Sequence, residues 1–391
     1  MAGPLDGIRI IDVTHMLAGP MATMMLADQG ADVIKIEPLE TGDVGRLRGE
    51  PAGMAPGFVM INRNKRSVAI NLKEPRGIEL VYRLATTADM FVQNFRAGTA
   101  ERLGLGELEL RRLKKDLVYV SINGFGESGP YAHKRAYDPI IQALSGAAFI
   151  QRDRASERPH MVRIIISDKV TALTAAQAMT AALIAKIRTG QGQHVRLAML
   201  DAVASFLWPE EMDNYAYPES RRFVKPTVRD LVYETADGYI TAAVVADREW
   251  RGLCRALEHP EWLEDSRFKT QADRLANADE RFGLIGEALK TISSSDALAR
   301  LEKEEIPCAP VLSSREMIDD AQVRHNELVV EYNHPFSGRT RQTRPAARFE
   351  KTPQEIWRPA PMLGEHTDEI LSELGLSRDE LARLRSENVI L

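Results

Sequence analysis

Residues 8–37 read IRIIDVTHMLAGPMATMMLADQGADVIKIE, and this segment alternates between two kinds of local pattern. Short apolar runs rich in β-branched residues, at 8–13 and 31–37, predict two buried strands. Between them, a turn-like stretch precedes an apolar run with helical spacing, which Gly30 closes. Strand, helix and strand in this order predict a βαβ unit, whose two strands are parallel.

The same alternation continues further along the chain. The segments RSVAINL (66–72), ADMFVQNF (88–95) and DLVYVSIN (116–123) predict three more strands, with helical patterns between them. From Asp168 to Arg188 the chain is Ala-rich without Gly or Pro, which predicts a long buried helix. We therefore expect an α/β fold with a Rossmann-like, doubly wound parallel sheet.

The segment LVYETADGYITAAVV (231–245) places Asp237-Gly238 between two β-rich runs, which is a hairpin signal. Two or three amphipathic helices are expected after it. A polar, basic, proline-containing stretch before it is typical of a connector. We expect a large domain from 1–205 and 325–391, linkers at 206–229 and 311–324, and a small α+β domain at 230–310.

The composition is that of an ordinary globular enzyme. Of 391 residues, 44% are hydrophobic and 27% charged, and the net charge is -5, so no general attraction to nucleic acid is expected. The start lacks a signal-peptide core and no apolar run approaches bilayer length, which predicts a cytoplasmic protein without membrane contact. Cys254 and Cys308 lack metal-ligand spacing, so both are expected to be buried small hydrophobes and no metal is expected.

A glycine-rich motif follows the predicted strand at 116–123. Residues 124–129, GFGESG, match the dinucleotide fingerprint GxGxxG, which requires a helix to start at the loop. Here Pro130 and a polar stretch come next. We therefore expect a Rossmann-like fold without a nicotinamide or flavin cofactor.

Several polar residues are candidates for a site. Asp168 opens the Ala-rich helix, where a helix cap and a nucleophile stabilised by the helix N-terminus are both reasonable interpretations. His15 follows the first strand, and Tyr137 with Asp138 would bring a hydroxyl and a second carboxylate to the same cleft. The basic block at 62–67, NRNKRS, fits either a phosphate site or solvated surface charge.

Taken together, these motifs extend over nearly the whole chain and resemble those of the family III CoA-transferases, the CaiB/BaiF group. That group includes formyl-CoA transferase and α-methylacyl-CoA racemase. The stretches that carry the resemblance are LDGIRIIDVTHMLAGPMATMMLADQGADVIKIE (5–37), NRNKRSVAINLK (62–73), NFRAGTAERLGLG (94–106), NGFGESGPYAHKRAYD (123–138), SDKVTALTAAQAMTAALIAKIRTGQGQHVRLAMLDA (167–202) and APMLGEHTDEIL (360–371).

The resemblance implies that Asp168 is the nucleophile that carries CoA from an acyl-CoA thioester to a free carboxylic acid, through mixed anhydrides and an aspartyl-CoA thioester. It also implies an interlocked homodimer and no permanently bound cofactor. The residues implied to bind CoA are Lys73, Asn94, Phe95, Arg102 and Arg135. The residues expected near the acyl group are His15, Leu17, Tyr137, Asp138, Gly124 and Gly126. An oxyanion is expected to be stabilised by backbone N–H groups of the loop from Gly124 to Gly129 or of the start of the Ala-rich helix.

Two other functions stay open at this point. A racemase would need an acid/base pair, and its typical Gly-His-Asp run is replaced here by Ala136-Tyr137-Asp138. A non-catalytic acyl-CoA-binding protein would bind ligand without turnover. Leu17 stands where formyl-CoA transferase has glutamine, and Pro38 replaces a frequent arginine, so oxalate is not the expected substrate. The default expectation is a reaction of a dicarboxylic acid, for example one with succinyl-CoA. Hydrophobic and aromatic acids remain open as substrates.

Overall fold

The computed structural model describes residues 3–47, 54–153, 156–211, 215–217, 219 and 230–391. The chain divides into two compact units. The first comprises Met1–Phe223 and Leu328–Leu391, and the second comprises Val224–Glu327. Each unit has its own hydrophobic core.

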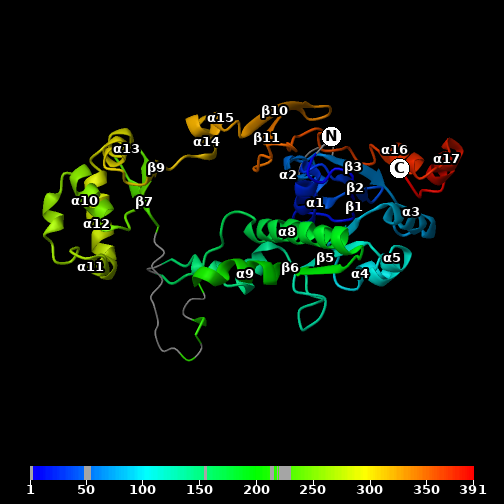
Figure 1. Ribbon diagram of the computed structural model, residues 1–391, viewed down its shortest axis with the longest axis horizontal. Helices are drawn as coiled ribbons and strands as arrows, with labels where there is room; N and C mark the ends of the chain where they lie inside the picture. Colours follow the sequence, from blue (N-terminus) through cyan, green and yellow to red (C-terminus); the bar gives the residue numbers. More distant parts are fainter. Residues whose placement is uncertain (1–2, 48–53, 154–155, 212–214, 218, 220–229) are drawn as a thin grey trace. The chain divides into compact units, whose positions relative to one another are not determined.

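A six-stranded parallel sheet forms the centre of the first unit (Figure 1). Its strands are β1 (Arg9–Asp12), β2 (Asp32–Glu37), β3 (Lys65–Ala69), β4 (Met90–Gln93), β5 (Val118–Asn123) and β6 (His194–Ala198), in the order β3-β2-β1-β4-β5-β6. This confirms the predicted parallel α/β sheet. The strand order reverses between β1 and β4, and ligands of open α/β sheets bind at the carboxyl ends of the strands on either side of such a point.

Helices cover both faces of the sheet. On one face α1 (Ala18–Asp28) and α8 (Ile166–Thr189) pack side by side on apolar residues of β1, β4 and β5. On the other face lie α3 (Pro75–Thr87), α5 (Glu107–Leu113), α16 (Thr367–Glu373) and α17 (Arg378–Ser386). The remaining elements of this unit are η1 (Val44–Leu47), α2 (Pro56–Ile61), α4 (Thr99–Arg102), α6 (Asp138–Leu144), α7 (Ala147–Ile150), α9 (Met199–Glu211) and the hairpin β10 (Val329–His334) with β11 (Gly338–Thr343).

Helix α8 is the long Ala-rich helix that the sequence predicts. Its small buried side chains, among them Ala172, Ala175 and Ala182, allow α1 and the sheet to approach closely. By length and composition alone this helix could cross a membrane, so the expectation that no apolar run approaches that length was wrong. Near its end Lys186 pairs with Asp89 at 2.8 Å.

The basic block at 62–67 is buried and paired inside the fold. Arg63 contacts Asp28 of α1 at 2.8 Å, and Lys65 contacts Asp12 of β1 at 2.9 Å. Arg66 pairs with carboxylates of β2 and α16. Both interpretations offered for this block, a phosphate site and solvated surface charge, were therefore wrong. Its cations instead join β3 to the elements around it.

The second unit contains the predicted hairpin. Strands β7 (Val232–Glu234) and β8 (Tyr239–Ala242) are antiparallel, and β9 (Cys308–Pro310) pairs with β8. Between β8 and β9 lie α10 (Asp247–Ala256), η3 (Pro260–Leu263), α11 (Gln271–Ala276), α12 (Ala278–Leu289) and α13 (Ser294–Lys303), more helices than the two or three expected. The unit ends with α14 (Ser314–Asp319) and α15 (Ala321–His325).

The two cysteines differ from each other. Cys254 is fully buried in this core, and burial raises the pKa of its thiol to about 12, which fits the expected inert small hydrophobe. Cys308 is only half-buried, so the prediction of a buried side chain was wrong for this residue.

Candidate active site

The carboxyl edge of the sheet brings together several segments that the sequence singled out. Strand β1 is followed by His15, β4 by Asn94 and β5 by the glycine-rich loop at 124–129. Helix α8 connects back to the parallel strand β6, so its first turn starts at this same edge. The topology therefore places the start of α8 and the loops after β1, β4 and β5 on one side of the molecule.

His15 contacts both Asn94 and Phe95. This places one residue predicted near the acyl group beside two that are predicted to bind CoA. The Asn94 side chain accepts a hydrogen bond from the His15 backbone N–H at 3.0 Å and donates one to the His15 carbonyl at 2.8 Å. The rings of His15 and Phe95 lie 5.6 Å apart. Burial lowers the pKa of His15, and the nearby Lys35 ammonium adds to this effect, so the imidazole is neutral near pH 7.

The loop that carries His15 is fixed by buried charges that sequence reasoning missed. Lys35 pairs with Asp43 at 2.9 Å and donates to the Thr14 carbonyl at 2.7 Å. Asp43 also accepts from the Met16 N–H at 3.0 Å, and Met16 has a positive φ of 71°. Leu17 is the N-cap residue of α1 and is half-buried. A lysine inside an apolar strand carries no sequence signal for such a partner.

Asp168 lies in the first turn of α8 and is half-buried. The helix starts at Ile166 after an N-cap at Ile165, so the interpretation of Asp168 as the cap was wrong. The capping group is Asp138, whose carboxylate accepts from the backbone N–H of Ser167 at 2.6 Å and of Asp168 at 3.4 Å. A carboxylate at a helix N-terminus is stabilised by the helix dipole.

Gln142 is a second buried residue that sequence reasoning missed. Its amide donates to the Asp138 carboxylate at 2.6 Å and to the Val162 carbonyl at 3.3 Å. Its side-chain oxygen accepts from the Val162 N–H at 2.9 Å. The spacing from Asp138 to Gln142 along α6 was the available signal, because residues four apart on a helix are neighbours.

The glycine-rich loop makes a close turn beside α8. A Cβ atom at Gly124 would lie 2.2 Å from the Cβ of Ala136, and Gly126 has a φ of +99°. The Gly126 N–H donates to the Asn123 side chain at 2.5 Å, and Phe125 packs into an apolar cluster that includes residues of α8. The chain forms no helix directly after this loop, as expected, since α6 begins only at Asp138.

The other predicted residues are exposed. Lys73 follows β3, and Arg102 at the end of α4 donates to Thr99 at 2.8 Å. Arg135 and Tyr137 lie at the surface before α6. Within the described residues, no hydrogen bond or ion pair joins these four side chains to each other or to His15, so their roles stay predictions.

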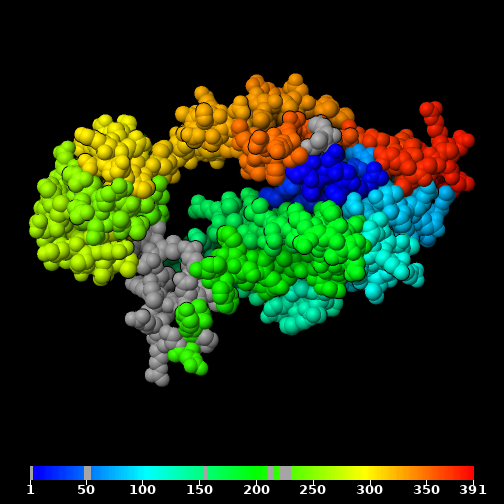
Figure 2. Space-filling view, viewed as in Figure 1, coloured from blue at the N-terminus to red at the C-terminus, as the bar shows by residue number. Residues whose placement is uncertain are grey.

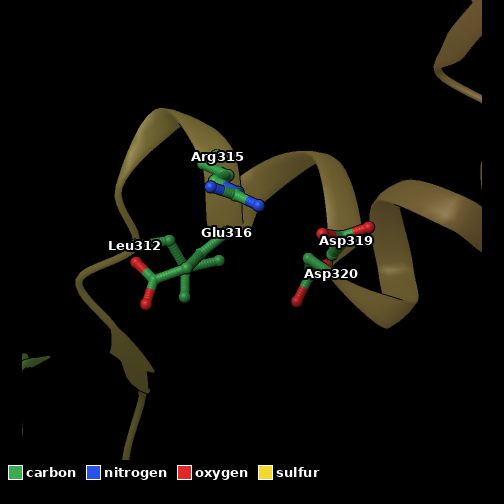
Figure 3. Close-up of a pocket in the computed structure, with 5 residues that line it drawn as sticks. All are labelled: Leu312, Arg315, Glu316, Asp319 and Asp320. Carbon is green, nitrogen blue, oxygen red and sulfur yellow. The ribbon is translucent and has the colours of Figure 1, made fainter.

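A surface hollow of about 280 Å³ in the second unit is a different feature (Figure 3). It is lined by Leu312, Arg315, Glu316, Asp319 and Asp320. Two of its carboxylates form hydrogen bonds at helix starts: Glu316 accepts from the Ser313 N–H, and Asp320 caps α15. In the described ranges of the chain no group of three His, Cys, Asp or Glu side chains could hold a metal ion. We do not assign chemistry to this hollow.

Comparison with known proteins adds an independent line of observation. Residues 5–367 match the family model described as CoA-transferase family III. The sequence is 34% identical to succinyl-CoA:glutarate CoA-transferase of Mus musculus, over 95% of this chain and 86% of that protein. It is 33% identical to formyl-CoA:oxalate CoA-transferase of Shigella sonnei, over the full length of both. A solved CaiB/BaiF family protein from Brucella suis superposes with a TM-score of 0.83 at 31% identity, over 96% of this chain and 100% of that one.

Proposed function

The chain belongs to CoA-transferase family III, and from this premise we propose that Asp168 carries coenzyme A between an acyl-CoA thioester and a free dicarboxylic acid. The observation that carries the assignment is the position of Asp168 in the first turn of α8, at the edge of the sheet where His15 and Asn94 also lie. The names of two relatives support the substrate class, since both describe transfer to or from a dicarboxylic acid.

The proposed reaction proceeds through four nucleophilic attacks. The Asp168 carboxylate attacks the donor thioester, which expels CoA thiolate and leaves an aspartyl-acyl anhydride. The thiolate attacks the aspartyl carbonyl, which gives an aspartyl-CoA thioester and releases the donor acid as a carboxylate. The acceptor carboxylate attacks this thioester and again expels thiolate. The thiolate then attacks the acceptor carbonyl of the second anhydride, which forms the new acyl-CoA and restores Asp168.

The oxyanions formed in these steps need hydrogen-bond donors, and three backbone N–H groups near Asp168 already have acceptors. The backbone N–H groups of Ser167 and Asp168 already donate to Asp138, and that of Gly126 donates to Asn123. We therefore propose that these three groups hold the site in shape and that the oxyanion is stabilised by other donors at this edge.

We also propose that two chains form the interlocked homodimer that the family resemblance implies. The helices α8 and α9 lie at the surface of the first unit (green in Figure 2) and expose apolar side chains that water solvates poorly. The large exposed residues on α8 and α9 are Leu173, Ile184, Ile187, Phe206 and Trp208. The domain boundaries, the residues that bind CoA and a cytoplasmic location are retained as proposals with it.

The test is a CoA-exchange assay on purified protein with pairs of acyl-CoA donors and free acids, followed by mass spectrometry. The expected result is that, for at least one pair, CoA moves from the donor to the acceptor acid and the acyl-CoA of the acceptor appears in the mass spectrum. If no pair exchanges but the α-proton of a 2-methylacyl-CoA exchanges with deuterated solvent, the racemase function is correct. Binding of acyl-CoA without either reaction would identify a non-catalytic binding protein.

A further inference from the structure

Resting on the proposed transferase function, we propose that Arg163 binds the distal carboxylate of a dicarboxylic substrate. In this arrangement Asp168 reacts at one end of the acid and Arg163 holds the other end. Gln142 fixes the distance between them, so the site selects acids by charge and by chain length.

The segment at 162–168 is held as one hydrogen-bonded piece. Gln142 binds both backbone groups of Val162, at 2.9 Å to the N–H and 3.3 Å to the carbonyl. The same side chain binds Asp138 at 2.6 Å, and Asp138 caps the first turn of α8. Gln142 is only 2% exposed and Asp138 only 7%. Buried, fully used side chains of this kind leave the backbone at Val162 little freedom relative to Asp168.

Arg163 is the residue next to this anchored position, and its side chain is exposed. Within the part of the chain that the structure describes, no hydrogen bond or ion pair engages its guanidinium group. Two cations on strands of the sheet are already paired and so differ from Arg163. Lys35 pairs with Asp43 at 2.9 Å and Arg196 with Glu127 at 2.7 Å. An arginine with its full set of donors available is suited to bind a carboxylate with two parallel hydrogen bonds.

The short stretch of chain between Arg163 and Asp168 limits how far apart the two residues can lie. Arg163 and Asp168 are five residues apart, so their Cα atoms are separated by at most about 18 Å even in a fully extended chain. The actual separation is shorter, because the Ile166 N–H donates to the Ile164 carbonyl at 2.8 Å and Asp168 is already helical. In the proposed arrangement the two side chains reach toward each other, with the methylene groups of the acid between them.

The residues between the two charged groups match the middle of such an acid. Ile164 is 52% exposed and Ile165 is 36% exposed. A dicarboxylic acid has an apolar methylene chain between two charged ends, and these isoleucines offer it an apolar surface. A monocarboxylic acid of the same length would leave the Arg163 charge without a partner.

The first test compares glutarate with pentanoate as acceptors, because the two acids have equal carbon number and differ in one carboxylate. We expect Arg163→Met to lower the ratio of kcat/KM for glutarate to that for pentanoate by about 10- to 100-fold, the range for loss of a charged hydrogen bond. Arg163→Lys should retain part of the ratio. Arg158→Met, on the same exposed stretch, is the matched control and should keep the wild-type ratio.

The second test addresses chain length with malonate, succinate, glutarate and adipate. Gln142→Met keeps the side-chain length but removes the hydrogen bonds to Val162 and Asp138, so we expect a broader length profile than that of the wild type. An unchanged glutarate-to-pentanoate ratio in Arg163→Met would overturn this inference while the transferase function stands. If the wild-type protein exchanges CoA with no acid at all, both fail together.

Discussion

The carboxylate of Asp138 accepts a 2.6 Å hydrogen bond from the backbone N–H of Ser167, the residue immediately before the proposed nucleophile. The cap of α8 is thus supplied by α6 and not by the helix's own sequence. Because Asp138 also binds Gln142 at 2.6 Å, the position of Asp168 depends on the packing of α6. We therefore assign Asp138 a positioning role through backbone contacts.

Removal of this cap should affect both stability and rate. Asp138→Ala leaves two helix-start N–H groups without their acceptor, and loss of a cap typically costs about 1 kcal/mol of unfolding free energy. We expect a similar loss in urea denaturation and a decrease in kcat, with acyl-CoA KM changing less. Asp138→Asn retains an acceptor oxygen, so its unfolding free energy and its kcat should lie between those of the wild type and of Asp138→Ala. A wild-type kcat in Asp138→Ala would contradict the positioning role.

Asn94 should act through the loop that carries His15. Asn94→Ala removes the hydrogen bond that the side chain accepts from the His15 N–H and the one that it donates to the His15 carbonyl. Each partly buried group left unpaired lowers the unfolding free energy by up to about 1–3 kcal/mol. We therefore expect lower stability and a higher KM for acyl-CoA. Asn94→Asp keeps the acceptor and loses the donor, and it separates the two contributions. Unchanged binding of acyl-CoA in both variants would argue against this loop as part of the site.

The close approach of Gly124 to Ala136 gives a compensating pair of substitutions. Gly124→Ala places a Cβ atom 2.2 Å from the Ala136 Cβ, and overpacking of this kind costs about 1–3 kcal/mol. The double variant Gly124→Ala with Ala136→Gly removes the clash, so we expect it to recover thermal stability and exchange activity. If the double variant is no more stable than Gly124→Ala alone, the contact does not determine the loop conformation.

Stability should decline as the pH falls from neutral. Burial would raise the pKa values of Asp12, Glu37 and Asp43, but their cationic and hydrogen-bonding partners hold all three below the usual range. The unfolded state therefore binds protons first, and this stabilisation is present above about pH 4 and lost as pH falls through the folded values. The pKa of His15, lowered by burial from 6.5, adds a decline that begins near that pH.

Urea unfolding between pH 7 and pH 3 measures this dependence, because the contribution of the three carboxylates is lost only below about pH 4. We expect a continuous decrease in the unfolding free energy, and His15→Asn should reduce the slope between pH 7 and pH 5. A free energy that rises toward pH 3 would contradict the assigned directions of these pKa shifts.

Much of the fold follows from local patterns in the sequence. The parallel strands and α8 were predictable because apolar periodicity and glycine punctuation act over a few residues. The pairing of Arg63 with Asp28 was not, since these residues are 35 positions apart and only the folded chain brings them together. For the same reason the sequence suggested Asp138 as a cleft carboxylate but carried no sign of its contact with Ser167.

The central claim is that Asp168 is the nucleophile, and trapping of its covalent intermediate tests that claim most directly. The protein would be incubated with an active acyl-CoA and hydroxylamine, and the peptide containing Asp168 analysed by mass spectrometry. We predict an acyl-CoA-dependent hydroxamate on Asp168, with neither adduct nor exchange in Asp168→Ala. Exchange that persists in Asp168→Ala, or an adduct on another residue, would contradict the proposed mechanism.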